Sequence, residues 1–211
     1  MNFEYKEQWN EIFDNHIKSN KEIKCNVWLD KYYDNIIKNS LNILDLGCGY
    51  GENVKYLLKK EKNVSACDYS DSAIKIININ FPSVKTKVFD MSDGLEYDDN
   101  TFDLIIAELS MHYFSEQVTL NIISELKRIL NKNGNLILKV NSVKEFENGE
   151  SQGRQIEKNF FELNNKKKRF FDEDEIKRFF KDWNIVSILE NEMVKYYKPK
   201  VSLECLIKVV K

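Results

Sequence analysis

Three glycines alternate over residues 47–51, and they directly follow a short apolar run at residues 42–46. The run reads as a strand, and apolar residues at helical spacing come after the turn, at Val54, Leu57 and Leu58. A strand, a tight glycine turn and a helix in this order bring backbone N–H groups and a helix N-terminus against a ligand. This segment therefore predicts a ligand-binding turn on which the rest of the chain is organised.

The charges around this turn separate two classes of ligand. A dinucleotide pyrophosphate favours the pattern G-x-G-x-x-G, but here the third glycine comes one residue early and Glu52 stands in its place. Asp45 lies just before the turn. Two carboxylates repel a pyrophosphate and attract a cationic ligand, such as S-adenosylmethionine (SAM) with its sulfonium and ammonium groups. A nicotinamide-dependent oxidoreductase is therefore the disfavoured alternative.

The segment Asp45-Leu46-Gly47-Cys48-Gly49-Tyr50-Gly51 resembles the first motif of class I SAM-dependent methyltransferases, D-x-G-C-G-x-G, and the chain is similar to methyltransferase types 11 and 25 within that family. Residues 102–114 resemble a second family block, in which the fourth strand ends beside the transferable methyl group. Residues 169–211 are loosely similar to tellurite-resistance methyltransferases. The alternative for the glycine motif is a turn that merely joins a core strand to a helix.

The resemblance implies one Rossmann-like α/β domain over residues 1–211, with a doubly wound, seven-stranded mixed sheet that is mostly parallel, its last strand antiparallel, and helices on both faces. The apolar runs agree with this order of elements. They predict strands at residues 42–46, 63–67, 85–89, 102–108, 135–141, 184–190 and 201–210. Helix N-caps are predicted at Ser70 and Ser115, and at Asp172 in a capping box with Glu175.

Asp68 ends the second predicted strand, and its spacing from Gly49 is close to the ~20 residues that place a carboxylate on ribose hydroxyls. Parallel neighbouring strands end at the same edge of a sheet, so this carboxylate faces the crevice of the glycine turn. It can accept two hydrogen bonds from a cis-diol. A role in helix capping is the alternative, although Ser70 is the better cap.

Asp90 and Met91 follow the third predicted strand. The resemblance implies that Asp90 binds the adenine amino group and that Met91 packs on the ring, whereas a plain turn is the alternative for Asp90. The family's cofactor site, with SAM as cofactor and S-adenosylhomocysteine (SAH) as product, maps onto Asp45, Gly47, Cys48, Gly49, Gly51, Asp68, Tyr69, Asp90, Met91 and Glu108, with Tyr5 and Trp9 added from the N-terminal segment.

A catalytic base is needed only if the methyl acceptor must lose a proton. His112 is the first candidate, because an imidazole titrates near neutral pH and His112 follows the fourth strand. Glu108, at the end of that strand, is the second. The alternative for His112 is a residue that packs or shapes the acceptor site.

Two segments flank the predicted sheet. Residues 1–40 have aromatic and aliphatic side chains near helical spacing, which predicts two helices. Within them, Tyr5 or Trp9 either packs at the sheet edge or, as in the resembled family, folds over the cofactor. Residues 142–169 have no clear period, so we expect a long loop that serves as a substrate lid. Its basic run, residues 166–169, is expected to be a solvated turn, with anion or RNA binding as the alternative.

The composition excludes several classes of protein. The formal net charge is −2 over 211 residues, so no overall basic field favours nucleic acid or a membrane surface. Four scattered cysteines and two histidines offer no metal-ligand spacing, and we expect no metal. Free thiols, no signal peptide and no apolar run of ~20 residues favour a cytoplasmic protein.

The sequence says less about the methyl acceptor than about the fold or the cofactor. We expect a small molecule held under residues 142–169, and a monomer or homodimer. Residues after the fourth strand lack the N-P-P-Y pattern of enzymes that methylate base or glutamine amides. The alternatives are a tRNA or protein acceptor that docks on the lysine run, and a protein that binds SAM without catalysis.

Overall fold

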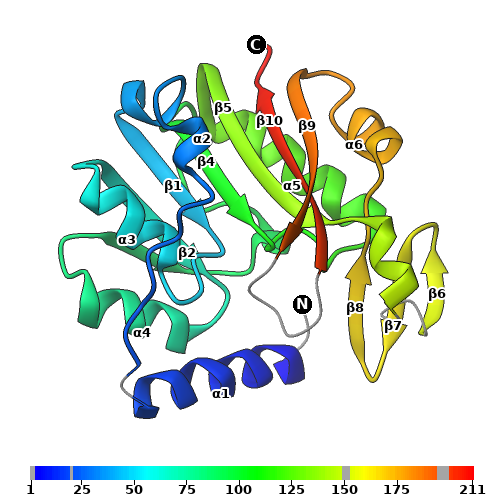
Figure 1. The fold of residues 1–211 in the computed structure, drawn as a ribbon, viewed down its shortest axis with the longest axis horizontal. Helices are drawn as coiled ribbons and strands as arrows, with labels where there is room; N and C mark the ends of the chain where they lie inside the picture. Colours follow the sequence, from blue (N-terminus) through cyan, green and yellow to red (C-terminus); the bar gives the residue numbers. More distant parts are fainter. Residues whose placement is uncertain (1–2, 20, 149–152, 194–199) are drawn as a thin grey trace.

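In the computed structural model, which describes residues 3–19, 21–148, 153–193 and 200–211, a seven-stranded sheet runs through the centre of the chain (Figure 1). Its strand order is β3-β2-β1-β4-β5-β10-β9. The strands are β1 (Asn42–Leu46), β2 (Asn63–Asp68), β3 (Lys85–Val88), β4 (Phe102–Glu108), β5 (Leu130–Asn141), β9 (Asn184–Met193) and β10 (Lys200–Lys208).

One strand of this sheet runs against the others. β10 pairs antiparallel with β5 and with β9, between which it lies, while β1 to β5 pair in parallel. The strand order reverses direction from β1 to β4, and ligands of such sheets bind at the carboxyl ends of the strands beside that reversal. The predicted Rossmann-like mixed sheet is confirmed.

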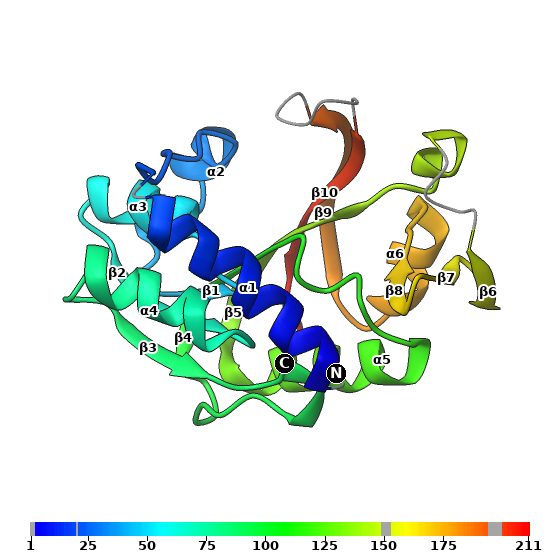
Figure 2. The same cartoon turned by 90° about the horizontal axis from the view of Figure 1, so that it is seen from below.

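Helices cover both faces of the sheet. They are α1 (Phe3–Ser19), α2 (Asp30–Tyr33), α3 (Glu52–Lys59), α4 (Asp71–Asn80), α5 (Glu116–Ile129) and α6 (Glu173–Phe179), with single 3-10 turns η1 (Ile37–Asn39) and η2 (Met91–Asp93) and a longer one, η3 (Val143–Asn148). One core cluster joins the sheet to α5 and α6, and a second joins its other face to α2, α3 and α4. α1 crosses below the carboxyl ends of the parallel strands (Figures 1 and 2) and packs on α4.

The predicted N-cap residues of α4, α5 and α6 are confirmed. The Ser70 Oγ atom accepts from the Ala73 N–H at 3.2 Å, and Asp172 Oδ1 accepts from the Glu175 N–H at 2.7 Å. The Ser115 Oγ atom accepts from the Val118 N–H at 3.5 Å. These side chains supply acceptors for N–H groups that the first helical turn leaves unpaired. The Glu175 carboxylate does not complete the box, since it accepts from the Asn159 side chain instead.

Three local predictions were wrong. The second N-terminal helix is only the short α2 and η1. Residues 142–169 are not a loop, because they contain η3 and a separate antiparallel sheet of β6 (Arg154–Glu157), β7 (Phe160–Leu163) and β8 (Lys166–Arg169). The basic run is a strand that ends in a fully buried Arg169, not a solvated turn. The sequence predicted a connection through residues 196–199, which lie outside the described residues.

The small sheet β6–β8 was not predicted, although its sequence contains a local signal. This signal lies in the turn residues and not in an alternation of apolar and polar residues. Asn164 and Asn165, between β7 and β8, have φ of 50° and 61°, and Asn159, between β6 and β7, has φ of 58°. Asparagine tolerates this left-handed region, and two such residues in succession form the hairpin turn that matches the twist of the strands. The hairpin was not predicted because its strands are polar and lack the apolar alternation that indicates a strand.

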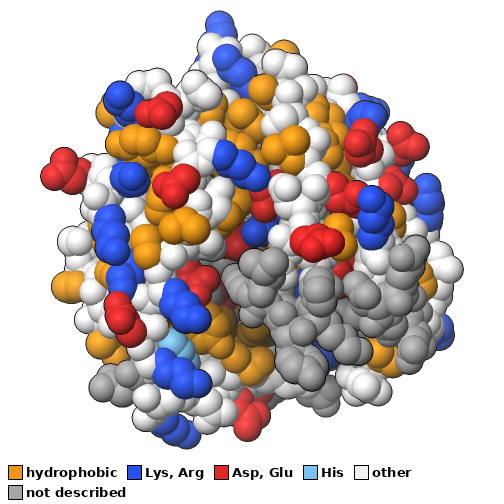
Figure 3. Space-filling model, in the orientation of Figure 1, with side chains coloured by type: hydrophobic (Ala, Val, Ile, Leu, Met, Phe, Trp, Pro, Cys, Tyr) orange, Lys and Arg blue, Asp and Glu red, His pale blue; other side chains and the backbone are white. Residues whose placement is uncertain are grey.

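The distribution of surface charge and the free state of the cysteines are consistent with the composition. Charged side chains of both signs intermingle over the face drawn in Figure 3. Cys25, Cys48, Cys67 and Cys205 are free thiols, and all except Cys25 are buried. No helix of the described residues is long and apolar enough to cross a membrane.

Candidate active site

A cavity of about 390 Å³ lies at the carboxyl ends of β1, β2 and β4. This volume is within the range of small-molecule sites. α1 closes one side, and β8 and β10 each contribute a side chain. The lining residues are Trp9, Phe13, Gly47, Cys48, Gly49, Tyr50, Glu52, Asn53, Asp68, Met91, Glu108, Leu109, Ser110, His112, Tyr113, Asn141, Lys168 and Lys200.

The glycine turn is packed tightly against β4. Gly47 has φ of +79°, and a Cβ atom there would lie 2.4 Å from the Cβ atom of Ser110. The Ser110 hydroxyl donates to the Leu46 carbonyl at 2.7 Å. The N–H groups of Gly47 and Cys48 both donate to the Cys67 carbonyl, at 2.9 and 3.0 Å. Glycine is required at residue 47 both for its backbone conformation and for this close approach.

Asp68 joins the end of β2 to the glycine turn. Its carboxylate accepts from the Gly49 N–H and from the Ser70 N–H, both at 2.9 Å. Burial raises the pKa of Asp68 above its usual value, although these N–H groups oppose the shift. The side chain lines the cavity, as predicted from its spacing to Gly49.

Asp45 lies behind the turn and does not line the cavity. The side chain is fully buried, and Oδ1 accepts from the Asn53 amide at 3.3 Å. Its other oxygen, Oδ2, has no hydrogen-bond partner among the described residues. Burial raises the pKa of Asp45 to about 8, against the effect of the Asn53 hydrogen bond. A buried carboxyl oxygen without a partner provides an acceptor for a donor group that enters the site.

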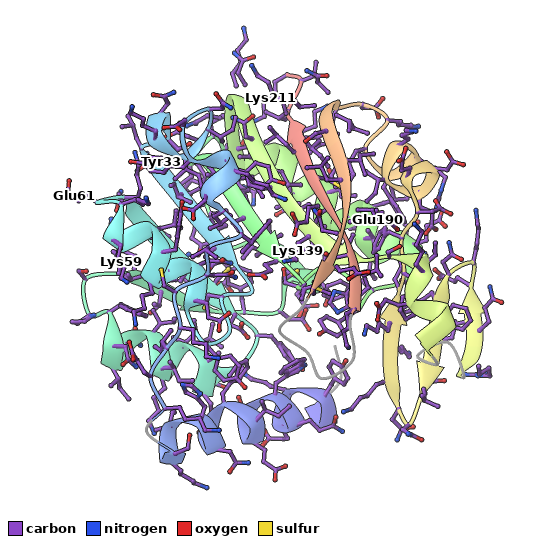
Figure 4. The ribbon with its side chains drawn as sticks, in the orientation of Figure 1. Tyr33, Lys59, Glu61, Lys139, Glu190 and Lys211 are labelled. Atoms are coloured by element: carbon purple, nitrogen blue, oxygen red, sulfur yellow. The ribbon has the colours of Figure 1, made fainter. Side chains whose placement is uncertain are left out.

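Glu108 belongs to a row of buried charges across three strands. Lys139 Nζ lies 3.5 Å from Glu108 Oε1 and 3.2 Å from Glu204 Oε1, and the strand register sets Glu108 and Glu204 on either side of Lys139. Lys139 lies in the middle of the sheet (Figure 4). The Asn26 amide donates to Glu108 Oε2 at 2.7 Å. The row places a partly neutralised carboxylate in the cavity wall.

His112 is 3% exposed, and its Nδ1 atom has no hydrogen-bond partner among the described residues. Its ring lies 4.1 Å from that of Tyr113, centroid to centroid. Burial lowers the pKa of His112 well below its usual value, and the charges of Lys168 and Lys200 lower it further. The imidazole is therefore neutral near pH 7, and it can donate or accept a hydrogen bond in the cavity.

The structure brings most of the predicted site residues together. Trp9, Gly47, Cys48, Gly49, Asp68, Met91, Glu108 and His112 all line the one cavity. Gly51, Tyr69 and Asp90 lie outside its lining, as does Asp45. The Asp90 carboxylate accepts from the N–H and the hydroxyl of Ser92 at the start of η2. Tyr5 lines a second cavity of about 240 Å³, which shares Tyr113 with the first.

Sequence reasoning missed several polar residues of the site. Asn53, Asn141, Lys168 and Lys200 line the cavity, and Lys139 lies buried beside it. One signal was available for Asn141 and Lys139, because both interrupt the apolar stretch of β5 near its carboxyl end. Lys168 and Lys200 carry no such signal, since nothing local relates β8 and β10 to the glycine turn.

The comparisons with known proteins agree with this geometry. Residues 43–134 match the model of a methyltransferase domain. The match spans less than half of the chain, and this part of the chain is similar to methyltransferase domains. A protein of Synechocystis sp. named as an uncharacterised methyltransferase is 30% identical over 92 residues, and the match covers 44% of this chain and 43% of that protein. The chain thus matches less than half of the length of this curated relative.

Solved structures of methyltransferases share the fold of this chain. A SAM-dependent methyltransferase from Methanosarcina mazei has a TM-score of 0.74 at 18% identity, with 89% of this chain and 99% of that chain covered. One from Clostridium acetobutylicum gives 0.69 at 20%, covering 97% and 99%. The 1,6-didemethyltoxoflavin-N1-methyltransferase of Burkholderia thailandensis, solved with its substrate and SAH, gives 0.65 at 14%, covering 99% and 90%.

The cavity fits SAM, the cofactor of the methyltransferases that this chain resembles. Acidic side chains line it at Glu52, Asp68 and Glu108, and they suit a ligand with two cationic groups. Apolar side chains for an adenine ring are present at Trp9 and Met91. The unpaired Oδ2 atom of Asp45 adds a buried acceptor behind the turn.

Proposed function

We propose that this methyltransferase transfers the methyl group of SAM to a small molecule that binds in the same cavity, beside His112. The observation that carries the proposal is the continuity of the cavity. One part of its wall is the glycine turn with Asp68, and another consists of His112, Tyr113 and Asn141. Cofactor and acceptor can therefore lie side by side in one cavity.

The residues of the site align the acceptor atom with the methyl group and the sulfur of SAM. When bound, SAM supplies an electrophilic methyl group on a sulfonium, which is a good leaving group. The acceptor atom must approach that methyl group in line with the sulfur, and proximity supplies much of the rate of such reactions. The backbone of the glycine turn and the carboxylate of Asp68 hold one reactant. His112, in the segment that follows β4, and Asn141, at the end of β5, hold the other.

A small acceptor is favoured over a macromolecule by how the cavity is covered. α1 contributes Trp9 and Phe13 to the lining, and the small sheet β6–β8 contributes Lys168. The small sheet thus stands where the predicted lid was expected, and we propose that it covers the acceptor. The alternative of tRNA or protein docking loses support, because Arg169 of the basic run is buried in ion pairs with Glu157 and Glu175. The toxoflavin methyltransferase with a similar fold also acts on a small molecule.

Two measurements on the full chain test the proposal. Calorimetry with SAM and with NAD should show binding of SAM alone, and binding of NAD alone would overturn the cofactor assignment. A labelled-methyl screen over thiols, carboxylates, amines and tRNA should then label a small molecule. Labelling of tRNA alone would contradict a small acceptor. Tight SAM binding without transfer to any acceptor would favour the non-catalytic alternative.

A further inference from the structure

A second cavity, of about 240 Å³, lies beyond Tyr113, whose side chain lines both cavities. Aromatic side chains from three segments form much of its wall. They are Tyr5 of α1, Tyr113 and Phe114 after β4, and Phe160 of β7. The amino-terminal end of α1 points toward α5 and the small sheet β6–β8 (Figure 2). Parts of the chain that are far apart in sequence thus enclose the second cavity.

The two cavities follow one another along the same elements. Trp9 lines the first cavity and Tyr5 lines the second, and residues four apart lie on one face of a helix. Met91 and Ser92, which are adjacent in η2, are divided between the two cavities in the same way. The Tyr113 ring meets both aromatic rings of α1 edge to face, with centroids 5.8 Å from Tyr5 and 6.0 Å from Trp9. This ring is thus the boundary between two adjoining spaces.

The volumes indicate what the second cavity adds to the site. Sites for a single small molecule range over about 300–1,000 Å³, so the first cavity, at about 390 Å³, has limited room for an acceptor beside the cofactor. The acceptor atom has to meet the methyl group inside the first cavity. The rest of the acceptor has about 240 Å³ beyond Tyr113. The small sheet supplies part of the wall there, through Phe160 and Lys167.

Arg169 fixes two of the aromatic side chains of this wall. Its guanidinium carbon lies 5.0 Å from the centroid of the Phe160 ring, and its Nε atom donates to the Phe114 carbonyl at 3.1 Å. Phe160 and Phe114 are only 3% and 4% exposed. The two rings are therefore held in place by the protein, which reduces the ordering that binding of a ligand would require.

The wall favours an uncharged aromatic group. Among the described residues the second cavity has no acidic side chain in its lining, and Lys167, the charged residue there, is exposed. Burial raises the pKa of Tyr5 to about 12, so its hydroxyl is un-ionised at neutral pH. Aromatic rings attract one another in edge-to-face and offset-stacked pairs, whereas a saturated group of the same size gains burial without that attraction.

We propose that the second cavity binds an aromatic ring of the methyl acceptor, while the atom that receives the methyl group lies beside His112 in the first cavity. This inference rests on the proposed function for the identity of the ligand as acceptor. The acceptor is then a molecule of two parts that extends past Tyr113. Its ring lies under the small sheet, against Phe114 and Phe160. An acceptor without a ring would leave these aromatic side chains without a matching partner.

The first test uses the full chain loaded with SAH. 2-Naphthol is the aromatic probe, and decahydro-2-naphthol is its saturated match with the same hydroxyl group. An NMR titration should show saturable binding of 2-naphthol, at least about tenfold tighter than binding of the saturated probe. Equal affinity for the two probes, or no binding of 2-naphthol up to its solubility limit, would overturn the proposal.

The second test changes the wall of the second cavity. Phe160→Leu keeps an apolar side chain but removes a ring, and Val118→Trp fills the cavity from α5. Each should weaken binding of 2-naphthol about tenfold, while SAH affinity stays unchanged. Phe161→Leu is the matched control, because successive side chains of β7 point to opposite faces of the small sheet. Phe161 packs on Phe170 instead, with ring centroids 6.1 Å apart, so this change should alter neither affinity.

Two outcomes of the second test contradict the proposal. Unaltered 2-naphthol affinity in both cavity variants would sink the idea. Lower SAH affinity in both variants would place part of the cofactor in the second cavity, and the acceptor ring would lose its site. If one variant fails to fold, the other decides together with the comparison of the two probes.

The two proposals fail in different ways. Binding of 2-naphthol that depends on Phe160 and Val118, without methyl transfer to any acceptor, would support the aromatic site and contradict the proposed function. Methyl transfer only to acceptors that lack an aromatic ring, at rates unchanged in the two cavity variants, would support the function and contradict the aromatic site. 2-Naphthol as a competitor in the labelled-methyl assay provides this distinction.

Discussion

At the scale of single residues, Asp45 is a group whose ionised form is disfavoured by its buried surroundings. Its carboxyl is fully buried, one oxygen has no partner among the described residues, and burial raises its pKa to about 8. In the unfolded chain an aspartate titrates near 4. Between these two values the folded protein holds a proton that the unfolded chain has released. The stability of the cofactor-free protein should therefore fall as pH rises through this window.

We expect the free energy of unfolding to decrease by up to about 1.4 kcal/mol per pH unit between about pH 6 and pH 8 in the absence of cofactor. Asp45→Asn carries no titrating proton, so it should flatten this slope in urea unfolding. Asp103→Asn is the control. Hydrogen bonds from Asn42, Asn131 and Leu41 outweigh burial and keep the pKa of Asp103 below its usual value, so this change should lower stability by a similar amount across pH 6–8 and leave the slope there unchanged. An equal slope in wild type and Asp45→Asn would contradict the assignment.

His112 is the second residue whose protonation state determines what it can do in the reaction. Its lowered pKa keeps the ring neutral above pH 6.5, so we expect kcat to be insensitive to His112 protonation from there upward. His112→Ala should lower kcat by ~10²-fold, through lost alignment or lost base catalysis, while SAH affinity changes little. Steady-state kinetics and calorimetry measure the two effects. Unchanged turnover would remove His112 from the mechanism.

A conservative variant separates the two roles of His112. Glutamine can donate and accept hydrogen bonds but cannot take up a proton. Recovery of most activity in His112→Gln would show that the ring positions the acceptor, and Glu108→Gln would then test the remaining candidate for a base. Loss equal to that of His112→Ala would favour His112 as the base.

At the scale of elements, the small sheet β6–β8 depends on one buried cation. Arg169 is fully buried, forms ion pairs with Glu157 and Glu175, and donates to the Phe114 carbonyl at 3.1 Å. These contacts join β6, β8 and α6 to the segment that follows β4. Burial raises the pKa of Glu175 above its usual value, and the charges of Arg169 and Arg178 oppose this shift.

Arg169→Ala should destabilise the protein by about 3–5 kcal/mol, because it removes a fully buried cation that pairs with Glu157 and with the buried Glu175. Hydrogen exchange should show the loss first in β6–β8 and α6. Arg154→Ala provides a matched control on the same sheet. Its ion pair with Glu162 is formed by a side chain that is 78% exposed, and such pairs contribute ~1 kcal/mol or less. Similar losses in both variants would show that burial of Arg169 is not decisive.

At the scale of the whole molecule, α1 crosses the carboxyl ends of the parallel strands (Figure 2). Its Trp9 and Phe13 line the cavity. Phe13 packs with Ala73 and Ile76 of α4, and Trp9 stacks on Phe13 with ring centroids 5.7 Å apart. The N-terminal segment therefore stands where it can cover a bound cofactor, which is the role predicted for Trp9.

Trp9→Ala should weaken SAH binding by about tenfold, since it removes apolar surface from the cavity wall. The melting temperature of the cofactor-free protein should change little, because the helix stays anchored through Phe13. Calorimetry with SAH measures the affinity. Ile12→Ala, at an exposed position on the same helix, is the control. An unchanged affinity in Trp9→Ala would assign the tryptophan to the packing of the helix alone.

Much of the fold was predictable because its signals are local. The apolar runs located the strands of the main sheet, and Ser70, Ser115 and Asp172 start their helices as predicted. The short polar strands β6 to β8 were missed, since their stability comes from Arg169 and from contacts with α6 rather than from an apolar period. Tertiary contacts override local propensity in such segments.

The sequence by itself determined the glycine turn and the acid at the end of β2, because a required backbone conformation and a fixed spacing are properties of the local sequence. Only the tertiary structure decided that Lys168 and Lys200 join His112 and Asn141 in the cavity lining, and that Lys139 lies buried between Glu108 and Glu204. These groups come from segments far apart in the chain, and β8 belongs to a separate small sheet, so the packing of the whole chain determines which of them meet. The glycine turn and its acid could therefore be predicted from the sequence, while the polar side chains in the rest of the cavity wall could not.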